Sequence, residues 1–286
     1  MTVEYKQSTL NGNPYAPSGA VVLQDREFTQ FSDLIYRIAG ISMAPTKKPL
    51  VSSRLAKRLK HHRLDSYADY FHLITSPNGK DELQMAVDML TTNETHFFRE
   101  PKHFDFLRQR IVPERRKGMA FRAWSAACSS GEEPYSIAMV LEELLGNQPW
   151  EVVASDISAR ILDKARNGIF PQERLPEIPK PYLSRYCLKG VGEYEGTLLI
   201  DKVLRERVRF MAHNLMQAPP KLGEFDVIFL RNVMIYFDQE TKQNVVQQLL
   251  PLLRPGGYFL VGHSESLNGV STAVKPVAPA IYRKPD

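Results

Sequence analysis

Short apolar segments alternate with helical segments along most of the chain beyond residue 100, and this alternation constrains the fold more than any other feature. The apolar segments lie at residues 119–126, 150–155, 208–212, 225–230, 257–262 and 280–283. Helices are predicted between them, at residues 132–145, 159–165 and 239–253. Strands that alternate with helices favour a mainly parallel sheet with helices on both faces. The chain is therefore predicted to contain an α/β domain.

The first hundred residues have a different character. Residues 1–20 are rich in Ser, Asn, Gly and Pro, which is typical of a mobile tail. Four helix patterns follow, and they begin near Asp25, Pro49, Ser66 and Asp81. We expect Asp25 to cap the first helix, Gly40 to end it, and Leu50 of the second helix to point inward. Residues 21–90 are therefore predicted to form an all-helical domain.

One stretch interrupts the alternation of strands and helices. It has glycines at positions 190, 192 and 196 followed by the apolar run 197–200, which predicts a β-hairpin with a long tip. We therefore expect a small β-subdomain inserted at about residues 186–206 of an α/β domain that spans residues 101–286. A linker of residues 91–100 joins this domain to the helical one.

The composition excludes several classes of protein. No apolar run reaches the roughly 18 residues that a membrane span needs, so membrane insertion is not expected. The beginning of the chain lacks the pattern of a signal peptide, which predicts a cytoplasmic protein. The two cysteines, Cys128 and Cys187, predict neither a disulfide scaffold nor a metal cluster. The net charge of +5 leaves nucleic acid, anionic lipid and acidic protein surfaces open as partners.

The segment WSAACSSGEEPYS, residues 124–136, lies between a predicted strand and a predicted helix, where a nucleotide-binding loop is expected. It contains one glycine, Gly131, whereas the dinucleotide fingerprint contains three. Glu132 and Glu133 follow at the start of the helix, and two carboxylates there would repel a pyrophosphate group. The ligand of this loop is therefore expected to be cationic and to lack a diphosphate.

Two further segments end at the same edge of the predicted sheet, where ligands of doubly wound sheets bind. Asp156 follows the strand at residues 150–155, and an acid at this point accepts hydrogen bonds from ribose hydroxyls. Arg231 and Asn232 follow the strand at residues 225–230. A ribose acceptor without a diphosphate cradle predicts an adenosine cofactor that carries no phosphate, and S-adenosylmethionine meets this description.

Four motifs in this order resemble the chemotaxis receptor methyltransferases, the CheR family. They are TTNETHFFRE at residues 91–100, GEEPYSIA at 131–138, ASDI at 154–157 and RNVMIYF at 231–237. The resemblance extends from about residue 25 to the end of the chain. It implies a Rossmann-like, S-adenosylmethionine-dependent methyltransferase domain with an N-terminal helical domain and an inserted β-subdomain. It also implies methyl transfer to glutamate side chains on chemoreceptor cytoplasmic helices, which forms glutamate γ-methyl esters in chemosensory adaptation.

The resemblance further implies roles for individual residues. The cofactor-binding residues are expected to be Asn93, Thr95, Arg99, Glu132, Asp156, Asn214, Leu215, Arg231 and Asn232. The linker members of this set are expected to close over the cofactor, Glu132 to hold its methionine or adenosyl end, and Asn214 with Leu215 to lie beside its adenine. Arg99 and Tyr236 are expected beside the transferred methyl group as catalytic residues. No metal ligand is expected.

Partners are suggested by charge and by the same resemblance. The basic residues Arg54, Lys57, Arg58 and Lys60 are predicted on one helix surface, which suits the acidic helical bundle of a chemoreceptor. The resemblance implies that the hairpin of residues 188–200 grips a pentapeptide at the C-terminus of a receptor by adding a strand to its sheet. Nucleic acid is not expected as a partner, because the Asn-Pro-Pro-Tyr signature of nucleic-acid methyltransferases is absent.

Three other functions remain as alternatives. A nicotinamide oxidoreductase shares the α/β fold, but the single glycine and the doubled acid disfavour it. The segment GHSES at residues 262–266 resembles the nucleophile elbow of hydrolases at Ser264, but no histidine follows His263 to complete a triad. We expect this segment to cap a following helix instead. A non-catalytic module that binds the cofactor as a signal is also consistent with the sequence.

Overall fold

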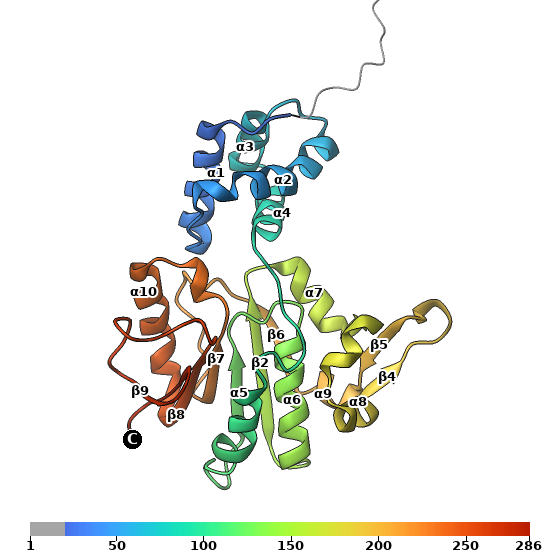
Figure 1. Ribbon diagram of the computed structural model, residues 1–286, viewed down its shortest axis with the longest axis vertical. Helices are drawn as coiled ribbons and strands as arrows, with labels where there is room; N and C mark the ends of the chain where they lie inside the picture. The colour runs from blue at the N-terminus through green and yellow to red at the C-terminus, as the bar shows by residue number, and fades with distance from the viewer. Residues whose placement is uncertain (1–20) are drawn as a thin grey trace, which may run out of the picture.

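The computed structural model describes residues 21–286, so the tail predicted at residues 1–20 lies outside the described residues. Figure 1 shows a helical domain set above an α/β domain, with a small second sheet projecting from the side of the α/β domain. The chain passes once between the two domains, through residues 91–100. None of the helices within residues 21–286 is long and apolar enough to cross a membrane.

Four α-helices form the helical domain, as the sequence pattern predicts. They are α1 Asp25–Ala39, α2 Lys48–His62, α3 Tyr67–Thr75 and α4 Lys80–Leu90. Ser66 caps α3 by accepting a hydrogen bond from the Asp69 N–H, and Gly40 ends α1 with a φ of 69°. The cap of α1 is Gln24 rather than Asp25, because Gln24 and Glu27 bond to each other's backbone in a capping box.

The core of the helical domain is aromatic, with Phe31, Tyr67 and Tyr70 fully buried between the helices. On α2 the buried residues are Val51, Leu55 and Leu59, which recur every four positions and therefore lie on one face. The prediction that Leu50 points inward is wrong, since Leu50 is 37% exposed. Its position is about 100° around the helix from Val51, so it falls beside the buried stripe.

The α/β domain is built on a seven-stranded sheet with the order β6-β2-β1-β7-β8-β10-β9. Its strands are β1 Phe121–Ser125, β2 Trp150–Asp156, β6 Val208–Ala212, β7 Phe225–Leu230, β8 Leu253–Val261, β9 Lys275–Ala278 and β10 Ile281–Arg283. The pairs from β6 to β8 are parallel, and β10 and β9 continue the sheet antiparallel at one edge. The predicted α/β class is confirmed, whereas β9 has no counterpart in the sequence prediction.

Helices cover both faces of this sheet (Figure 1). The main helices are α5 Pro101–Phe106, α6 Glu132–Leu145, α7 Ala159–Asn167 and α10 Gln239–Leu249. Neighbouring side chains on a strand enter different cores, so that Ala123 and Trp124 of β1 belong to separate buried clusters. Burial on both sides explains why these strands are continuously apolar. Helix α5 and the π-helical turn Leu107–Ile111 that follows it were not predicted.

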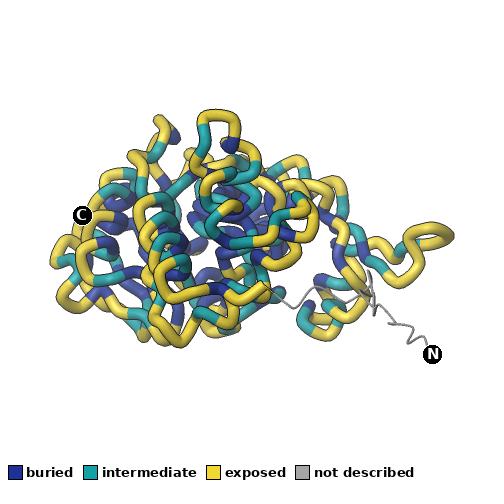
Figure 2. The backbone as a smooth tube through the Cα atoms, turned by 90° about the horizontal axis from the view of Figure 1, so that it is seen from above, coloured by how far each residue is buried: buried dark blue, intermediate teal, exposed yellow. Residues whose placement is uncertain are grey.

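A second sheet has the order β3-β5-β4 and contains the predicted hairpin. The hairpin strands β4 Cys187–Lys189 and β5 Thr197–Ile200 are antiparallel. A third strand that the sequence did not predict, β3 Ile169–Pro171, pairs with β5. Helix α8 Lys180–Tyr186 leads into the hairpin, and the short α9 Lys202–Arg205 follows it. Figure 2 shows the hairpin tip extending into solvent as an exposed loop.

The last turn of α1 attaches the helical domain to the α/β domain. The Asn214 side chain donates a hydrogen bond to the Ile38 carbonyl over 2.6 Å, and the Ser42 N–H donates to the Tyr236 carbonyl over 2.9 Å. Gly40 lies between these contacts, and a Cβ added there would lie 2.5 Å from the Met216 sulfur. The absence of a side chain at Gly40 therefore allows the two domains to approach closely.

We expect Gly40→Ala to lower the stability of the protein by more than the strain of a left-handed alanine, which is about 1–2 kcal/mol. The extra loss arises because the new methyl group overlaps Met216 and Thr241 of the α/β domain. Gly118→Ala is the matched control, because Gly118 has a φ of 80° and open space around its Cβ position. Equal shifts of the thermal unfolding midpoint in the two variants would contradict close packing at this point.

Candidate functional site

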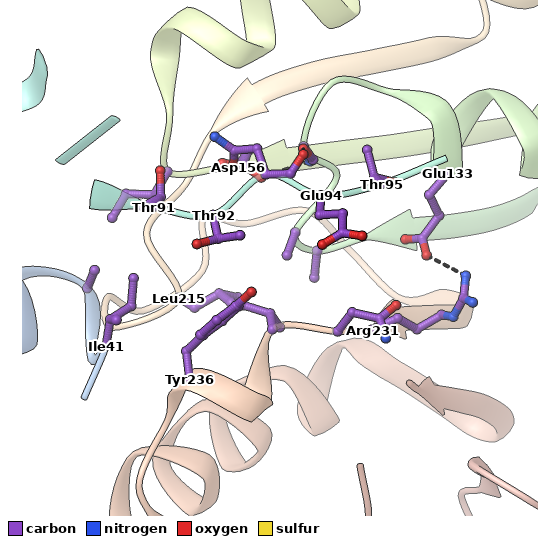
Figure 3. Close-up of a pocket in the computed structure, with 18 of the residues that line it drawn as sticks. Ile41, Thr91, Thr92, Glu94, Thr95, Glu133, Asp156, Leu215, Arg231 and Tyr236 are labelled. Atoms are coloured by element: carbon purple, nitrogen blue, oxygen red, sulfur yellow. Dashed lines mark hydrogen bonds and ion pairs between the residues drawn. The ribbon is translucent and has the colours of Figure 1, made fainter. Parts of the chain in front are cut away.

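A cavity lies at the carboxyl ends of the parallel strands, between the α/β domain, the linker and the end of α1. About 920 Å³ of space lies within it and before it, a volume that includes open solvent at its mouth. Figure 3 shows linker residues on one side of the cavity and Tyr236 with Arg231 on the opposite side. The sheet edge predicted to bind a ligand is therefore the edge that carries the cavity.

All the predicted site residues except Glu132 line this cavity. They are Asn93, Thr95, Arg99, Asp156, Asn214, Leu215, Arg231, Asn232 and Tyr236. These residues come from the linker and from the ends of three strands, and the set spans positions 93–236 of the sequence. The parallel sheet brings them together because its strands end at one common edge.

Glu133, rather than Glu132, provides the carboxylate at the start of α6 that faces the cavity. The Glu133 carboxylate accepts hydrogen bonds from the Ser125 hydroxyl and from Arg231. Glu132 is only 2% exposed, accepts from the Ser130 hydroxyl at 2.6 Å, and lies near the charge of Arg174. Adjacent helical residues point about 100° apart, so one acid of the pair turns away, and the sequence does not determine which.

Asp156 ends β2 with its carboxylate held by two backbone N–H groups. Ser129 donates to one oxygen over 2.8 Å and Ser158 to the other over 3.0 Å. Burial raises the pKa of Asp156, and these two N–H groups oppose that shift. The carboxylate is thus fixed at the cavity wall, and its remaining lone pairs are available to a ligand.

Gly131 has a packing role in the loop before α6. Its φ is 100°, and a Cβ there would lie 3.0 Å from the Cβ of Ala165 on α7. This glycine therefore permits close contact between two helices, and the loop contains no further glycine that would let a phosphate approach its backbone. The expectation that this loop does not cradle a diphosphate agrees with this geometry.

Arg231 is the centre of a buried ionic network beside the cavity. Its side chain is 1% exposed and donates to Glu133 over 2.8 Å and to Glu100 over 2.9 Å. A further hydrogen bond goes from Arg231 to the carbonyl of Arg99. One guanidinium group therefore connects the end of β7, the start of α6 and the end of the linker.

Glu100 was not predicted as a site residue, although it ends the TTNETHFFRE motif and precedes Pro101, which begins α5. Its carboxylate accepts hydrogen bonds from Arg231, from the Asn232 side chain and from the His263 N–H. Burial acts to raise the pKa of Glu100, but Arg231, the His263 N–H and the Asn232 side chain together outweigh burial, and the pKa falls to about 2. Glu100 thus orients two residues of the cavity without lining it.

Arg99 and Tyr236, the predicted catalytic pair, both line the cavity. Arg99 donates to the carbonyl of Glu94 over 2.7 Å, and no ion pair to its guanidinium is found within residues 21–286. Tyr236 lies in the short 3-10 turn Met234–Tyr236, and its hydroxyl points into the space beside Thr92 and Glu94 (Figure 3). Both side chains therefore belong to the wall of the cavity.

The linker is held over the cavity by the helical domain. Arg54 of α2 donates to the carbonyls of Leu90 and Thr91 over 3.1 and 3.0 Å, and Arg58 pairs with Glu82 over 2.6 Å. Arg54 and Arg58, two members of the predicted basic surface, are therefore already bonded to groups of this protein. Lys57 and Lys60 on the same helix remain exposed.

The GHSES segment forms turns after β8, so the expectation that it caps a helix is wrong. Glu265 accepts hydrogen bonds from the N–H groups of Gly262, Asn232 and Ile235 over 2.6–3.1 Å. Ser264 is exposed in a turn. Glu265 therefore fixes the backbone around Asn232 and the turn that carries Tyr236.

Comparison with protein families matches the "CheR methyltransferase, all-alpha domain" to residues 26–91 and the "CheR methyltransferase, SAM binding domain" to residues 93–282. The chain belongs to the CheR methyltransferase family. It is 44% identical over 260 residues to chemotaxis protein methyltransferase 2 of Pseudomonas aeruginosa, covering 90% of this chain and 92% of that one. It is 43% identical over 251 residues to the chemotaxis protein methyltransferase of Escherichia coli, covering 87% of each. This CheR protein is an S-adenosylmethionine-dependent methyltransferase.

The cavity has the chemistry that S-adenosylmethionine requires. Asp156 and Glu133 provide acceptors for hydroxyl groups and for a positive charge. His213 also lines the cavity and is 8% exposed, and its ring Nε2 atom has no hydrogen-bond partner among the described residues 21–286. An unpaired buried nitrogen is costly in the free protein, and a polar ligand such as a nucleoside offers it a partner. His213 was not predicted, because nothing in its sequence context marks it.

We expect Glu133→Gln to weaken S-adenosylhomocysteine binding by about tenfold or more, because a hydrogen bond to a charged group contributes about 1.5–3 kcal/mol. Glu132→Gln, one position away, is expected to change binding much less because Glu132 does not line the cavity. Isothermal titration calorimetry of both variants measures the difference. A larger loss in Glu132→Gln would reverse the assignment of the two acids.

The low pKa of Glu100 predicts a pH-dependent contribution to stability. Its pKa is about 2 in the folded protein and about 4.3 in an unfolded chain, so its contribution is full above about pH 5 and declines as the pH falls towards 2. We expect Glu100→Gln to be less stable than the parent near neutral pH, and the gap to narrow in acid. Urea unfolding of both proteins between about pH 7 and pH 4 measures it. A constant gap would contradict the shifted pKa.

Proposed function

We propose that this protein transfers the methyl group of S-adenosylmethionine to glutamate side chains on the cytoplasmic helices of chemoreceptors, forming γ-methyl esters. The observation that carries the proposal is a cavity lined both by the acceptor groups of Asp156 and Glu133 and by the side chains of Arg99 and Tyr236. The chemotaxis methyltransferases to which the chain is similar support the choice of receptor.

The cofactor contacts divide along the cavity wall. Asp156 accepts hydrogen bonds from the ribose hydroxyls, and Glu133 holds the positively charged methionine end. Asn214 and Leu215 lie at the adenine side, and Leu215 is 9% exposed, which suits an apolar contact with a base. The linker residues Asn93 and Thr95 and the strand-end residues Arg231 and Asn232 complete the enclosure.

The acceptor glutamate needs orientation rather than activation. Its carboxylate is ionised at neutral pH because the pKa of glutamate is about 4.3, so no general base is required. S-adenosylmethionine supplies the electrophilic methyl group when bound. Arg99 holds the carboxylate by charge-assisted hydrogen bonds, Tyr236 donates its hydroxyl to one oxygen, and the linker excludes water from the pocket.

The second sheet offers a docking point for a receptor segment. Strand β4 is an edge strand of this sheet, and Leu188, Val191 and Tyr194 along the hairpin are 52%, 76% and 51% exposed. An extended peptide, such as the C-terminal pentapeptide of a receptor, adds to such an edge by backbone hydrogen bonds. Receptor tails and methylated helices of this kind lie in the cytoplasm, where we place the protein.

The decisive experiment incubates the protein with receptor-containing membranes and S-adenosylmethionine labelled on its methyl group. Mild alkali is expected to release the label as volatile methanol, because it cleaves a carboxyl methyl ester and leaves a methylated nitrogen intact. Label that resists alkali would identify another acceptor atom. Cofactor binding without any labelling would favour the non-catalytic module.

Arg99→Lys and Tyr236→Phe separate orientation of the acceptor from binding of the cofactor. Lysine keeps the charge but loses the planar fork of donors, so we expect slower ester formation in both variants, with cofactor affinity nearly unchanged in Tyr236→Phe and reduced less than the rate in Arg99→Lys. Rates are expected to fall about tenfold or more, as for loss of a hydrogen bond to a charged group. A variant that forms ester at the parental rate would exclude that residue from the catalytic pair.

A further inference from the structure

A cluster of three potential metal ligands lies behind the cavity wall. The ligand atoms of Glu100, His103 and His263 all lie within 4.8 Å of one another. Glu100 ends the linker, His103 is in the first turn of α5, and His263 follows β8. The two imidazole rings meet edge to face, with centroids 4.8 Å apart. Two segments that are 163 positions apart thus present nitrogen and oxygen donors to one point.

His103 is the unusual member, because it is fully buried and neither of its ring nitrogens has a hydrogen-bond partner within residues 21–286. Its Nδ1 atom is 3.4 Å from a Glu100 oxygen. A neutral imidazole has one nitrogen with a free lone pair, which can bind a metal ion.

Glu100 has capacity left for one more partner. A carboxylate offers about four lone-pair positions, and Arg231, Asn232 and the His263 N–H occupy three of them. The oxygen shared with Arg231 is also the oxygen that faces His103. Arg231 does not exclude a cation here, because its single positive charge is matched by both Glu100 and Glu133, which leaves a net negative charge.

We propose that Glu100, His103 and His263 form a binding site for one divalent transition-metal ion of the zinc type. Two imidazole nitrogens and one carboxylate oxygen suit zinc, whereas magnesium and calcium prefer oxygen ligands. His263 is exposed and opens the site to solvent, so a water molecule completes the coordination. The ion joins the end of the linker to the sheet and stabilises the arrangement that closes the cavity.

Calorimetric titration of the full chain with zinc chloride in a non-chelating buffer tests the site directly. We expect one ion per chain, and a rise in the thermal unfolding midpoint with zinc concentration. His263→Ala is expected to weaken binding by at least about tenfold and to remove most of that rise. The variant keeps the backbone N–H at position 263 that donates to Glu100, so the ionic network of Arg231 is preserved.

Two controls make the result specific. His62→Ala should bind zinc like the parent, although His62 lies 2.9 Å from a Glu82 oxygen and represents the competing surface site. His103→Gln, which removes the buried ligand, should lose binding as His263→Ala does. The proposal would be overturned by any one of three results. These are loss of zinc binding in His62→Ala, unchanged zinc binding in His263→Ala, and no zinc binding by the parent protein at millimolar metal.

Discussion

The buried guanidinium of Arg231 is the interaction on which the cavity depends. A charge that is 1% exposed is tolerated only when it is paired, and here Glu133, Glu100 and the Arg99 carbonyl provide the pairing. These partners belong to two segments, the start of α6 and the end of the linker. An unpaired buried charge would destabilise the protein. The network therefore holds the sheet, the start of α6 and the linker at fixed distances from one another.

Backbone strain is concentrated around the same network. Glu100, Ser129 and Asn232 have φ values of 60°, 48° and 57°, a region that side chains other than glycine rarely adopt. These conformations go with hydrogen bonds of the site. The Ser129 N–H donates to the Asp156 carboxylate, and the Asn232 side-chain amide donates to the Glu100 carboxylate. The surrounding hydrogen bonds offset a strain of about 1–3 kcal/mol at each residue.

The helical domain contributes to the site through backbone contacts. Arg54 binds the carbonyls at the start of the linker, and Ile38 and Ser42 bind Asn214 and Tyr236 through their main-chain groups. Asn214 therefore contacts both the other domain and the cavity. Because these contacts all converge on the cavity, the position of the helical domain and the shape of the ligand pocket are coupled.

Local patterns in the sequence determined the helices and strands of the sheet, and they also determined which polar residues follow the strands. Continuous apolar runs predicted β1, β2, β7 and β8 because both faces of the sheet are buried, and Asp156 was identified because it directly follows such a run. Strands β3 and β9 were missed, since they are short and depend on β5 and β10 for their pairing.

Only the tertiary structure decided which polar groups meet. Glu132 and Glu133 are equivalent in sequence, and the position of Arg231, 98 residues away, determines which of them faces the cavity. Glu100, His213 and His263 likewise acquire their surroundings from distant segments. Residue type and hydrophobic periodicity determine whether a segment forms a helix or a strand. Burial and charge pairing between distant segments determine which groups its side chains contact.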